Sequence, residues 1–349
     1  MRLPAEVPDA DLPAAMLAQI VESKLVDADA AARLQQLLAR LGRDLPGMVA
    51  AGERVPLHWF RTMYPGLDAD RAAWLGHAAG EQTRLTSFAA LSLPLVSAGS
   101  VGEVLRLLEF MPLISSSVTA RFLARADDVV VMIQARSGDP VLDRFPVHYC
   151  AAAIQRLLAI LVAGTPSLEV HIAWPQPACF ADHPDLRAGR LHFDAPFHHL
   201  VVPNATMAEV CRFSDPVAYQ GALAGLIAQR QAAASDETVG RLKALLDGPD
   251  HRVGIDEAAR ALHLSVSTLK RRLAEAGTSF RALRDDALQQ RALLLLAEPS
   301  ATLASVGAAL GYGDLANFAH AFKRWTGQSP GAFRRRRARP AAASLPPGL

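Results

Sequence analysis

The sequence has few cysteines and no long apolar run, and each absence excludes a class of protein. Its three cysteines (Cys150, Cys179 and Cys211) are an odd number without metal-ligand spacing, so a disulfide framework is not expected. No run of about 18 apolar residues occurs, which argues against a membrane-spanning helix. The first residues carry acids and prolines where a signal peptide needs a basic and then an apolar segment, so we expect a cytoplasmic protein.

The sequence also lacks the motifs of common catalytic and cofactor sites. It has no G-x-S-x-G, no P-loop, no dinucleotide-binding glycine pattern and no H-E-x-x-H, so we expect neither enzymatic activity nor a cofactor. Five histidines do gather in one region: His171, His183, His192, His198 and His199. Imidazoles bind transition metals well, but no cysteine or carboxylate accompanies these at a recognisable ligand spacing. The sequence therefore predicts no metal site.

Charge is divided unevenly along a chain whose formal charge is only +2. Residues 239–339 hold 17 Lys and Arg against 9 Asp and Glu, a balance of +8, whereas the remainder holds 19 against 25, a balance of −6. A basic block is typical of a domain that binds a polyanion, although a soluble helical domain can also have a basic face without a partner. With 51% hydrophobic residues, the chain can supply cores for two domains.

Hydrophobic patterning changes near residue 235. Earlier residues show helical periods (12–42, 100–112, 146–163, 205–229) and strand-like runs (117–125, 129–135, 168–174, 189–195, 199–203), with a hairpin turn at 126–128. Later residues show only helical periods, interrupted by Gly277 and Gly327. The predicted organisation is an α+β domain at 12–228, a linker of small and polar residues at 229–238, an all-α domain at 239–335 and a disordered basic and proline-containing tail at 336–349.

The all-α part contains one pattern twice. Phe318 and Phe322 form an apolar stripe at helical spacing, and 49 residues earlier Leu269 and Leu273 do the same. The opposite faces correspond as well: Ser267, Lys270, Arg271 and Ala274 in the first copy, and Ala316, Ala319, His320 and Lys323 in the second. Upstream, Ala259 and Leu262 correspond to Gly307 and Leu310 at an offset of 48, so the second copy has one extra residue in its turn.

Each copy is typical of a helix-turn-helix, in which the first helix braces a second helix that enters the major groove of DNA. A small residue at Ala259 and at Gly307 suits the close crossing of the two helices. Two copies placed about one turn of DNA apart, ~34 Å, can enter successive major-groove segments on one side of the duplex. The predicted partner is double-stranded DNA. We assign the apolar and aromatic residues to the core: Leu269, Leu273, Phe280, Tyr312, Phe318, Phe322 and Trp325.

These residues resemble the DNA-binding domain of the AraC/XylS family of bacterial transcription regulators. The likeness covers about 239–335 and rests on "LSVSTLKRRLAEAGTSF", "QQRALLLL" and "SVGAALGYGDLANFAHAFKRWTGQSPGAFRR". Residues 12–228 are similar, at a lower level, to the N-terminal sensor domain of the subgroup that contains ornithine-responsive regulators. The resemblance implies a transcription regulator, more often an activator that contacts RNA polymerase than a repressor.

The sequence departs from the family at four positions. Arginine is usual in the family at the places of His320 and Leu288, glycine is frequent at His263, and alanine is frequent at Gly307. The second recognition helix therefore has few long donors, whereas the first keeps its basic residues. We expect the first copy to supply most base readout and the second to supply phosphate contacts and shape fit.

The candidate DNA-contacting residues are Ser267, Thr268, Lys270, Arg271, Ala316, Asn317, His320 and Lys323. Arg271 is the best guanine reader because a guanidinium can donate to O6 and N7 together. Lys323 is a phosphate candidate, and the run Arg334–Arg337 can add affinity that is independent of sequence. On a solvated helix face, any of these side chains can also be plain surface.

We thus expect a DNA-binding regulator that forms a homodimer and responds to a small-molecule effector, such as an amino acid, bound to the N-terminal domain. In the alternative, that domain serves only for dimerisation or for a protein partner. A catalytic N-terminal domain is a more distant alternative, against which the missing motifs argue.

Overall fold

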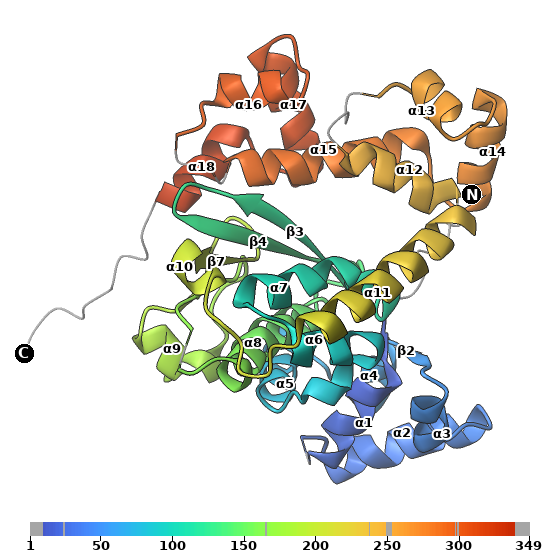
Figure 1. The fold of residues 1–349 in the computed structure, drawn as a ribbon, viewed down its shortest axis with the longest axis vertical. Helices are drawn as coiled ribbons and strands as arrows, with labels where there is room; N and C mark the ends of the chain where they lie inside the picture. Colours follow the sequence, from blue (N-terminus) through green and yellow to red (C-terminus); the bar gives the residue numbers. More distant parts are fainter. Residues whose placement is uncertain are drawn as a thin grey trace, which may run out of the picture. The chain divides into compact units, whose positions relative to one another are not determined.

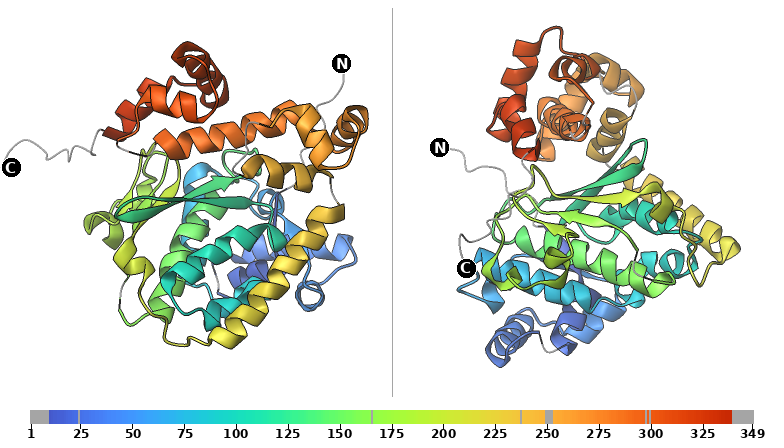
Figure 2. Two further views of the ribbon diagram at one scale, coloured as in Figure 1. Left: turned by 45° about the horizontal axis from the view of Figure 1, so that its top comes forward. Right: turned by 90° about the vertical axis from the view of Figure 1, so that its left-hand side faces the viewer.

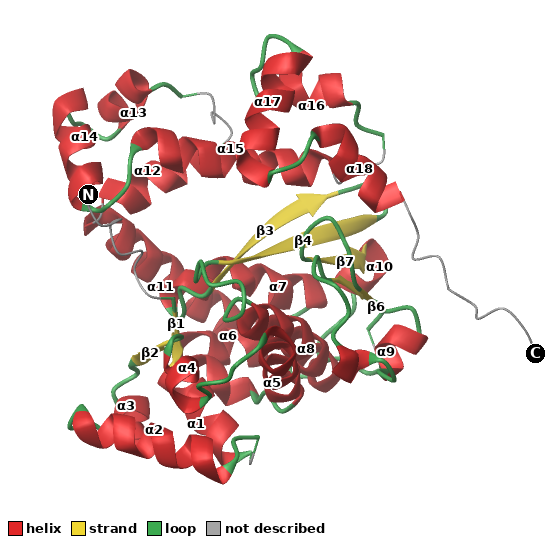
Figure 3. Cartoon of the chain, turned by 180° about the vertical axis from the view of Figure 1, so that it is seen from behind, coloured by secondary structure: helices red, strands yellow, loops and turns green. Residues whose placement is uncertain are grey.

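The computed structural model describes residues 10–338 except 24, 165, 237, 249–252, 297 and 299 (Figure 1). Backbone contacts divide the chain into two compact units: residues up to 194 with 198–231, and residues 195–197 with those from 232 onward. Among the described residues, strands occur only in the first unit, and the chain is helical from residue 216 apart from its turns (Figure 3). The predicted α+β domain followed by an all-α domain is confirmed.

The first unit contains a five-stranded sheet in the order β3-β4-β7-β5-β6. Its strands are β3 (Val118–Ala124), β4 (Asp128–Ala135), β5 (Glu169–His171), β6 (Leu191–His192) and β7 (His199–Pro203), one in each predicted run. Neighbours are antiparallel except β5 and β6, which are parallel. A separate antiparallel pair joins β1 (Asp11–Pro13) to β2 (Arg54–Pro56), so the start of the helical period predicted from residue 12 is extended.

Helices of the first unit surround one hydrophobic core. They are α1 (Ala14–Glu22), α2 (Ala28–Arg40), α3 (Leu45–Ala50), α4 (Trp59–Met63), α5 (Ala69–Glu81), α6 (Ser92–Ser97), α7 (Val101–Arg106), α8 (Arg144–Leu161), α9 (Pro184–Arg187), α10 (Asn204–Met207) and α11 (Pro216–Asp236), with the 3-10 helices η1 (Leu85–Leu91), η2 (Leu107–Leu113) and η3 (Ala178–Phe180). The central helix α8 packs against β4 of the sheet and against α5, which makes a layered arrangement (Figure 2).

The crossing of α5 and α8 is close because α5 presents glycine there. A Cβ atom at Gly76 would lie 2.2 Å from the backbone oxygen of Phe145, and one at Gly80 would lie 2.7 Å from the backbone oxygen of Tyr149. Both glycines are buried, four residues apart on one face of α5. The two helix backbones therefore touch at positions where no other side chain fits.

The same core contains polar groups that burial keeps neutral. His148 on α8 is 1% exposed, and burial lowers its pKa from the usual 6.5 to about 3, with further lowering by the charges of His77, His198 and Arg144. Burial also raises the pKa of the Cys150 thiol to about 12, and all three cysteines are free. These side chains are uncharged at neutral pH and act as packing residues.

The second unit consists of helices arranged about α15 (Phe280–Leu296). The others are α12 (Thr238–Asp247), α13 (Ile255–Ala261), α14 (Val266–Glu275), α16 (Leu303–Ala309), α17 (Leu315–Thr326) and α18 (Pro330–Ala338). The helix α15 contacts α12 on one side and both α16 and α17 on the other, so it connects two helical subassemblies (Figure 1). No described helix is long and apolar enough to cross a bilayer.

Two expectations about irregular segments are corrected. Residues 229–238, predicted as a linker, are largely helical, because α11 continues to Asp236 and α12 begins at Thr238. Their alanines and glutamines form no apolar stripe, but both residue types have high helix propensity, so the helix continues without hydrophobic periodicity. Residues 336–338, placed in a disordered tail, are the end of α18, and the remaining tail residues, 339–349, lie outside the described residues.

Candidate DNA-binding interface

The two helix-turn-helix units share their turn geometry. The backbone has a left-handed φ of 56° at His263 in the first turn and 86° at Gly311 in the second. In the first turn the amide of Leu264 donates to the carbonyl of Ala259 at 2.8 Å, and in the second the amide of Tyr312 donates to that of Gly307 at 2.9 Å. Each pair is matched at the offset of 48. The family's frequent glycine at His263 has a physical reason in this left-handed conformation.

The extra residue of the second unit lies just after this turn. In the first unit Ser265 follows Leu264 and caps α14 by accepting a hydrogen bond from the amide of Thr268 at 3.1 Å. In the second unit Gly313 intervenes, and Asp314 caps α17 by accepting from the amide of Asn317 at 2.7 Å. From the caps onward the offset is 49, as the sequence pattern predicted. Both recognition helices thus begin at a defined residue with a side-chain cap.

The brace and recognition helices cross at the predicted small residues. Ala259 on α13 and Gly307 on α16 are both buried. A Cβ atom at Gly307 would lie 3.3 Å from the Cβ of Phe318 on α17, which is tighter than ordinary contact. A larger side chain at this position would push α16 and α17 apart.

The apolar stripes lie inside, as expected. Leu269, Leu273, Phe318 and Phe322 are essentially fully buried, whereas Phe280, Tyr312 and Trp325 are half-buried. In the second unit the stripe is an aromatic cluster, in which the ring centroids of Phe318 and Phe322 lie 5.8 Å apart and those of Phe322 and Phe333 lie 5.5 Å apart. These contacts fix the side of each recognition helix that faces the domain.

The predicted DNA-contacting residues lie on the opposite side. Seven are exposed and Thr268 is half-buried: Ser267, Thr268, Lys270, Arg271, Ala316, Asn317, His320 and Lys323. The first four share α14 and the last four share α17. Within the described part of the chain, Lys270 and Lys323 have no ion-pair partner, so both ammonium groups are available to phosphates.

Several of these polar side chains already have local partners. The hydroxyl groups of Ser267 and Thr268 lie 3.0 and 2.8 Å from that of Ser265, and the side-chain amide of Asn317 donates to Asp314. Arg271 Nη1 donates to Oε1 of Glu275, one helical turn later, at 2.8 Å. The Arg271–Glu275 pair was not predicted, although its i, i+4 spacing on an exposed face was legible in the sequence. To read a base, Arg271 must exchange this exposed carboxylate for a base edge.

Arg324, next to Lys323, is turned away from this face. Its Nη2 lies 3.3 Å from both carboxylate oxygens of Asp285 on α15, and its guanidinium lies 6.0 Å from the ring of Trp325. This ion pair joins α17 to the connecting helix α15. Among the described residues, Lys323 has no ion-pair partner, whereas Arg324 has one.

Comparison with known proteins agrees with this architecture. The helix-turn-helix domain family matches residues 258–336, which include both units except the first three residues of α13. An ornithine utilization regulator of Pseudomonas aeruginosa is 24% identical over 269 residues, which are 74% of this chain and 78% of that protein. The HTH-type transcriptional regulator VqsM of the same organism is 35% identical over 146 residues, 41% of this chain and 43% of that protein.

Among solved structures, the transcriptional regulator CdpR from Pseudomonas aeruginosa is 24% identical and aligns over 89% of this chain and 99% of that one, with a TM-score of 0.39. The N-terminal unit has a family match of its own. The family described as the arabinose-binding domain of AraC transcription regulators, N-terminal, matches residues 32–210, just over half of the chain. The chain therefore belongs to the AraC family: it is a DNA-binding transcription regulator, and not an enzyme, with an N-terminal domain of the arabinose-binding type.

Proposed function

We propose that the protein is a sequence-specific transcription activator in which α14 reads bases and α17 contributes phosphate contacts and shape fit. The observation that carries the proposal is the pair of capped recognition helices, each with its apolar stripe buried and its polar or small face exposed. The connecting helix α15 has 17 residues. It is therefore ~25 Å long, and units at its two ends can be separated on the scale of one turn of DNA.

The division of labour follows from the donors on each helix. The exposed face of α14 carries Lys270 and Arg271, and the guanidinium of Arg271 can bond a guanine edge bidentately. The exposed face of α17 carries Ala316, which permits close approach, and His320, a weaker anchor than the arginine usual there. Phosphate contacts set position and general affinity, whereas base contacts set sequence preference.

Two single substitutions test this division. Arg271→Ala should cost about 1–3 kcal/mol of binding to the preferred operator and much less to random duplex, so that sequence preference relaxes. Lys323→Ala should weaken binding to all sequences by a similar factor and make binding less salt-dependent, because one phosphate contact is lost. Fluorescence anisotropy with an operator selected from the native genome and with random duplex, each at several salt concentrations, measures both effects.

The matched control is Lys243→Ala, which removes an exposed lysine of α12 outside both helix-turn-helix units and should leave the ratio of specific to random binding unchanged. The division is contradicted when Arg271→Ala lowers operator and random binding equally. It is also contradicted by a footprint in which only the half-site of the second unit depends on sequence.

The N-terminal unit is proposed to bind a small metabolite and to pass its presence on through differential affinity for two states of the protein. The family match supports this, as does a surface hollow of about 590 Å³ whose lining includes Asp27, Arg33, Tyr64 and Arg71. Groups of both charge signs suit a zwitterion such as an amino acid. In the alternative the unit only dimerises or binds a protein partner.

Thermal unfolding of the full chain across a panel of amino acids and related metabolites distinguishes the two cases. A ligand at one hundred times its Kd should stabilise the unit that binds it by about 2.7 kcal/mol. Absence of any shift across the panel favours the alternative.

The proposal also includes homodimerisation, contact with RNA polymerase and action in the cytoplasm. Sedimentation of the protein with and without operator tests the dimer.

A further inference from the structure

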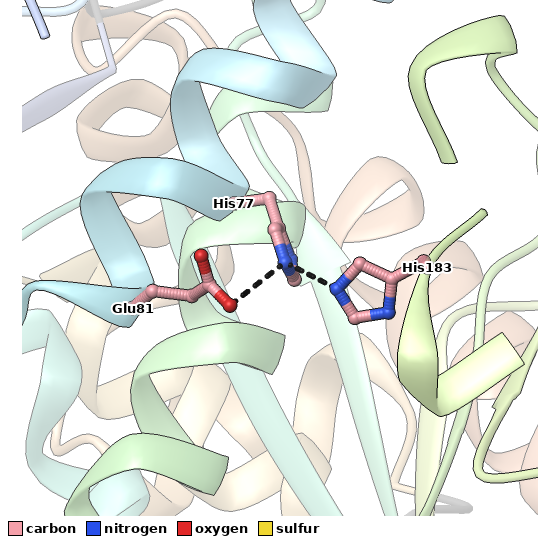
Figure 4. A group of neighbouring side chains, drawn as sticks. All are labelled: His77, Glu81 and His183. Carbon is pink, nitrogen blue, oxygen red and sulfur yellow. Dashed lines mark hydrogen bonds and ion pairs between the residues drawn. The ribbon is translucent and has the colours of Figure 1, made fainter. Parts of the chain in front are cut away.

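The N-terminal unit brings together three side chains that can ligate a metal ion, and the sequence pattern associated only one of them with a possible site. His77 and Glu81 lie one helical turn apart on α5, and His183 immediately precedes α9, more than a hundred residues later (Figure 4). The Nε2 atoms of His77 and His183 are 2.8 Å apart, and His77 Nε2 is 3.5 Å from Oε1 of Glu81. One ligand atom from each residue lies within 4.8 Å of the others.

We propose that His77, Glu81 and His183 bind one divalent transition-metal ion of the zinc class. Two imidazoles and one carboxylate are a donor set that Zn²⁺ accepts in proteins, with one position left for water or another ligand. The rings of His77 and His183 meet edge to face, at an interplanar angle of 82°, so that their nitrogens converge instead of stacking. Tetrahedral bonds of ~2.0–2.1 Å place two ligand nitrogens ~3.3 Å apart, so the two imidazoles need to separate by only about half an ångström.

The surroundings suit such an ion. The side chain of Glu81 is 61% exposed and that of His77 only 13% exposed, so the site opens to solvent on the carboxylate side and is closed behind the imidazole. The ring of Phe180 provides part of the closed wall, with its centroid 4.9 Å from that of His77 and 5.5 Å from that of His183. An apolar wall of this kind limits the access of water to the bound ion.

Metal ions bind the neutral form of imidazole and the ionised form of a carboxylate, so the donor set of two histidines and one glutamate needs no unusual chemistry.

Metal binding would change one hydrogen bond that now holds α9. His183 Nδ1 accepts from the backbone amide of Asp185 at 3.2 Å, so in neutral His183 the proton is on Nε2 and is donated to His77. A metal at Nε2 requires this proton to be on Nδ1 instead. A protonated Nδ1 can no longer accept a hydrogen bond from the amide of Asp185. The carboxylate of Asp185 accepts hydrogen bonds from Gln155 on α8 at 3.2 Å and from Arg190 beside β6 at 3.0 Å. Metal binding would thus alter the hydrogen bonding of the segment between α9 and the sheet.

A second group of similar composition is less suited to a metal. Glu169 lies 3.1 Å from His171 and 3.6 Å from His192. However, the rings of His171 and His192 stack at 4.5 Å with an angle of 15°, as do those of His171 and His199 at 4.4 Å and 8°. Because the lone pairs lie in the ring planes, stacked rings direct them side by side and not toward one point.

The test uses the full chain, freed of metal with EDTA, and titrates it with Zn²⁺ by calorimetry and with Co²⁺ by visible absorption. We expect one equivalent to bind, with the intense absorption of low-coordinate Co²⁺. Binding should weaken about tenfold or more in His183→Asn, which retains a residue able to cap α9, and in Glu81→Gln, which alters an exposed side chain. The matched control His171→Asn should bind as the wild type does.

Thermal unfolding in EDTA checks that each variant is folded. If His183→Asn does not fold, Glu81→Gln, which changes an exposed side chain, provides the test. The proposal is overturned when the wild type binds Zn²⁺ no more tightly than the Glu81→Gln, His183→Asn double variant. It is equally overturned when His171→Asn abolishes binding that His183→Asn retains, because the ion then occupies the stacked histidines.

Discussion

Replacing Gly76 by alanine is expected to destabilise the N-terminal unit by about 3 kcal/mol or more, at or beyond the upper end of the cost of overpacking a core. The added methyl group would lie 2.2 Å from the backbone oxygen of Phe145, a distance no relaxed structure tolerates. Because the obstacle is backbone, no side-chain rotation relieves it, and α5 and α8 must move apart. Alanine is the better helix former by about 1 kcal/mol, which does not offset the loss.

Denaturation followed by tryptophan fluorescence measures this effect, since Trp59, Trp74 and Trp174 are in the first unit and only Trp325 is in the second. The matched control is Gly225→Ala on α11, where a Cβ atom would meet nothing within 4 Å. That variant should be stabilised by up to about 1 kcal/mol. Equal stability of the Gly76→Ala and Gly225→Ala variants would show that α5 and α8 do not cross as closely as described.

The sequence predicted those parts of the fold that depend on local pattern. Alternating apolar residues located all five strands of the large sheet, and the 48-to-49 shift in offset located the insertion that the structure places at Gly313. The order of the strands could not be predicted. The strand β7 lies between β4 and β5, and this pairing depends on contacts between residues far apart in the sequence. The helical residues 229–236 were missed because they lack an apolar stripe.

The two candidate sites also differ in how far local sequence pattern could predict them. The exposed face of α14 was predictable because it is the complement of a buried stripe within one helix. The pairing of His183 with His77 was not, since neither position shows a spacing to the other and only the tertiary fold brings α5 beside the residues before α9. The i, i+4 spacing of His77 and Glu81 was visible, yet it is common on helix surfaces.

Replacing Phe322 by alanine is expected to cost about 3–5 kcal/mol, the range for removing a buried phenyl ring. Phe322 is fully buried between Phe318 and Phe333, so its loss leaves a cavity where α17 and α18 meet. A cost of this size is comparable to the whole stability of a small domain. We expect α16, α17 and α18 to lose their fold while α13 and α14 keep theirs, because the core of the first helix-turn-helix unit is made by a separate set of residues.

Hydrogen exchange of the full chain, followed by mass spectrometry, locates the change. Amides of 303–335 should lose protection in Phe322→Ala, and operator affinity should fall with them. Leu315→Ala is the matched control, since Leu315 begins the same helix but is 46% exposed and its truncation should cost little. Aromatic rings can also stack on bases. If Phe322 had that role, Phe322→Ala would reduce operator affinity while amide protection stayed at the wild-type level. Such a result would remove Phe322 from the core of the domain and place it on the DNA-facing side of α17.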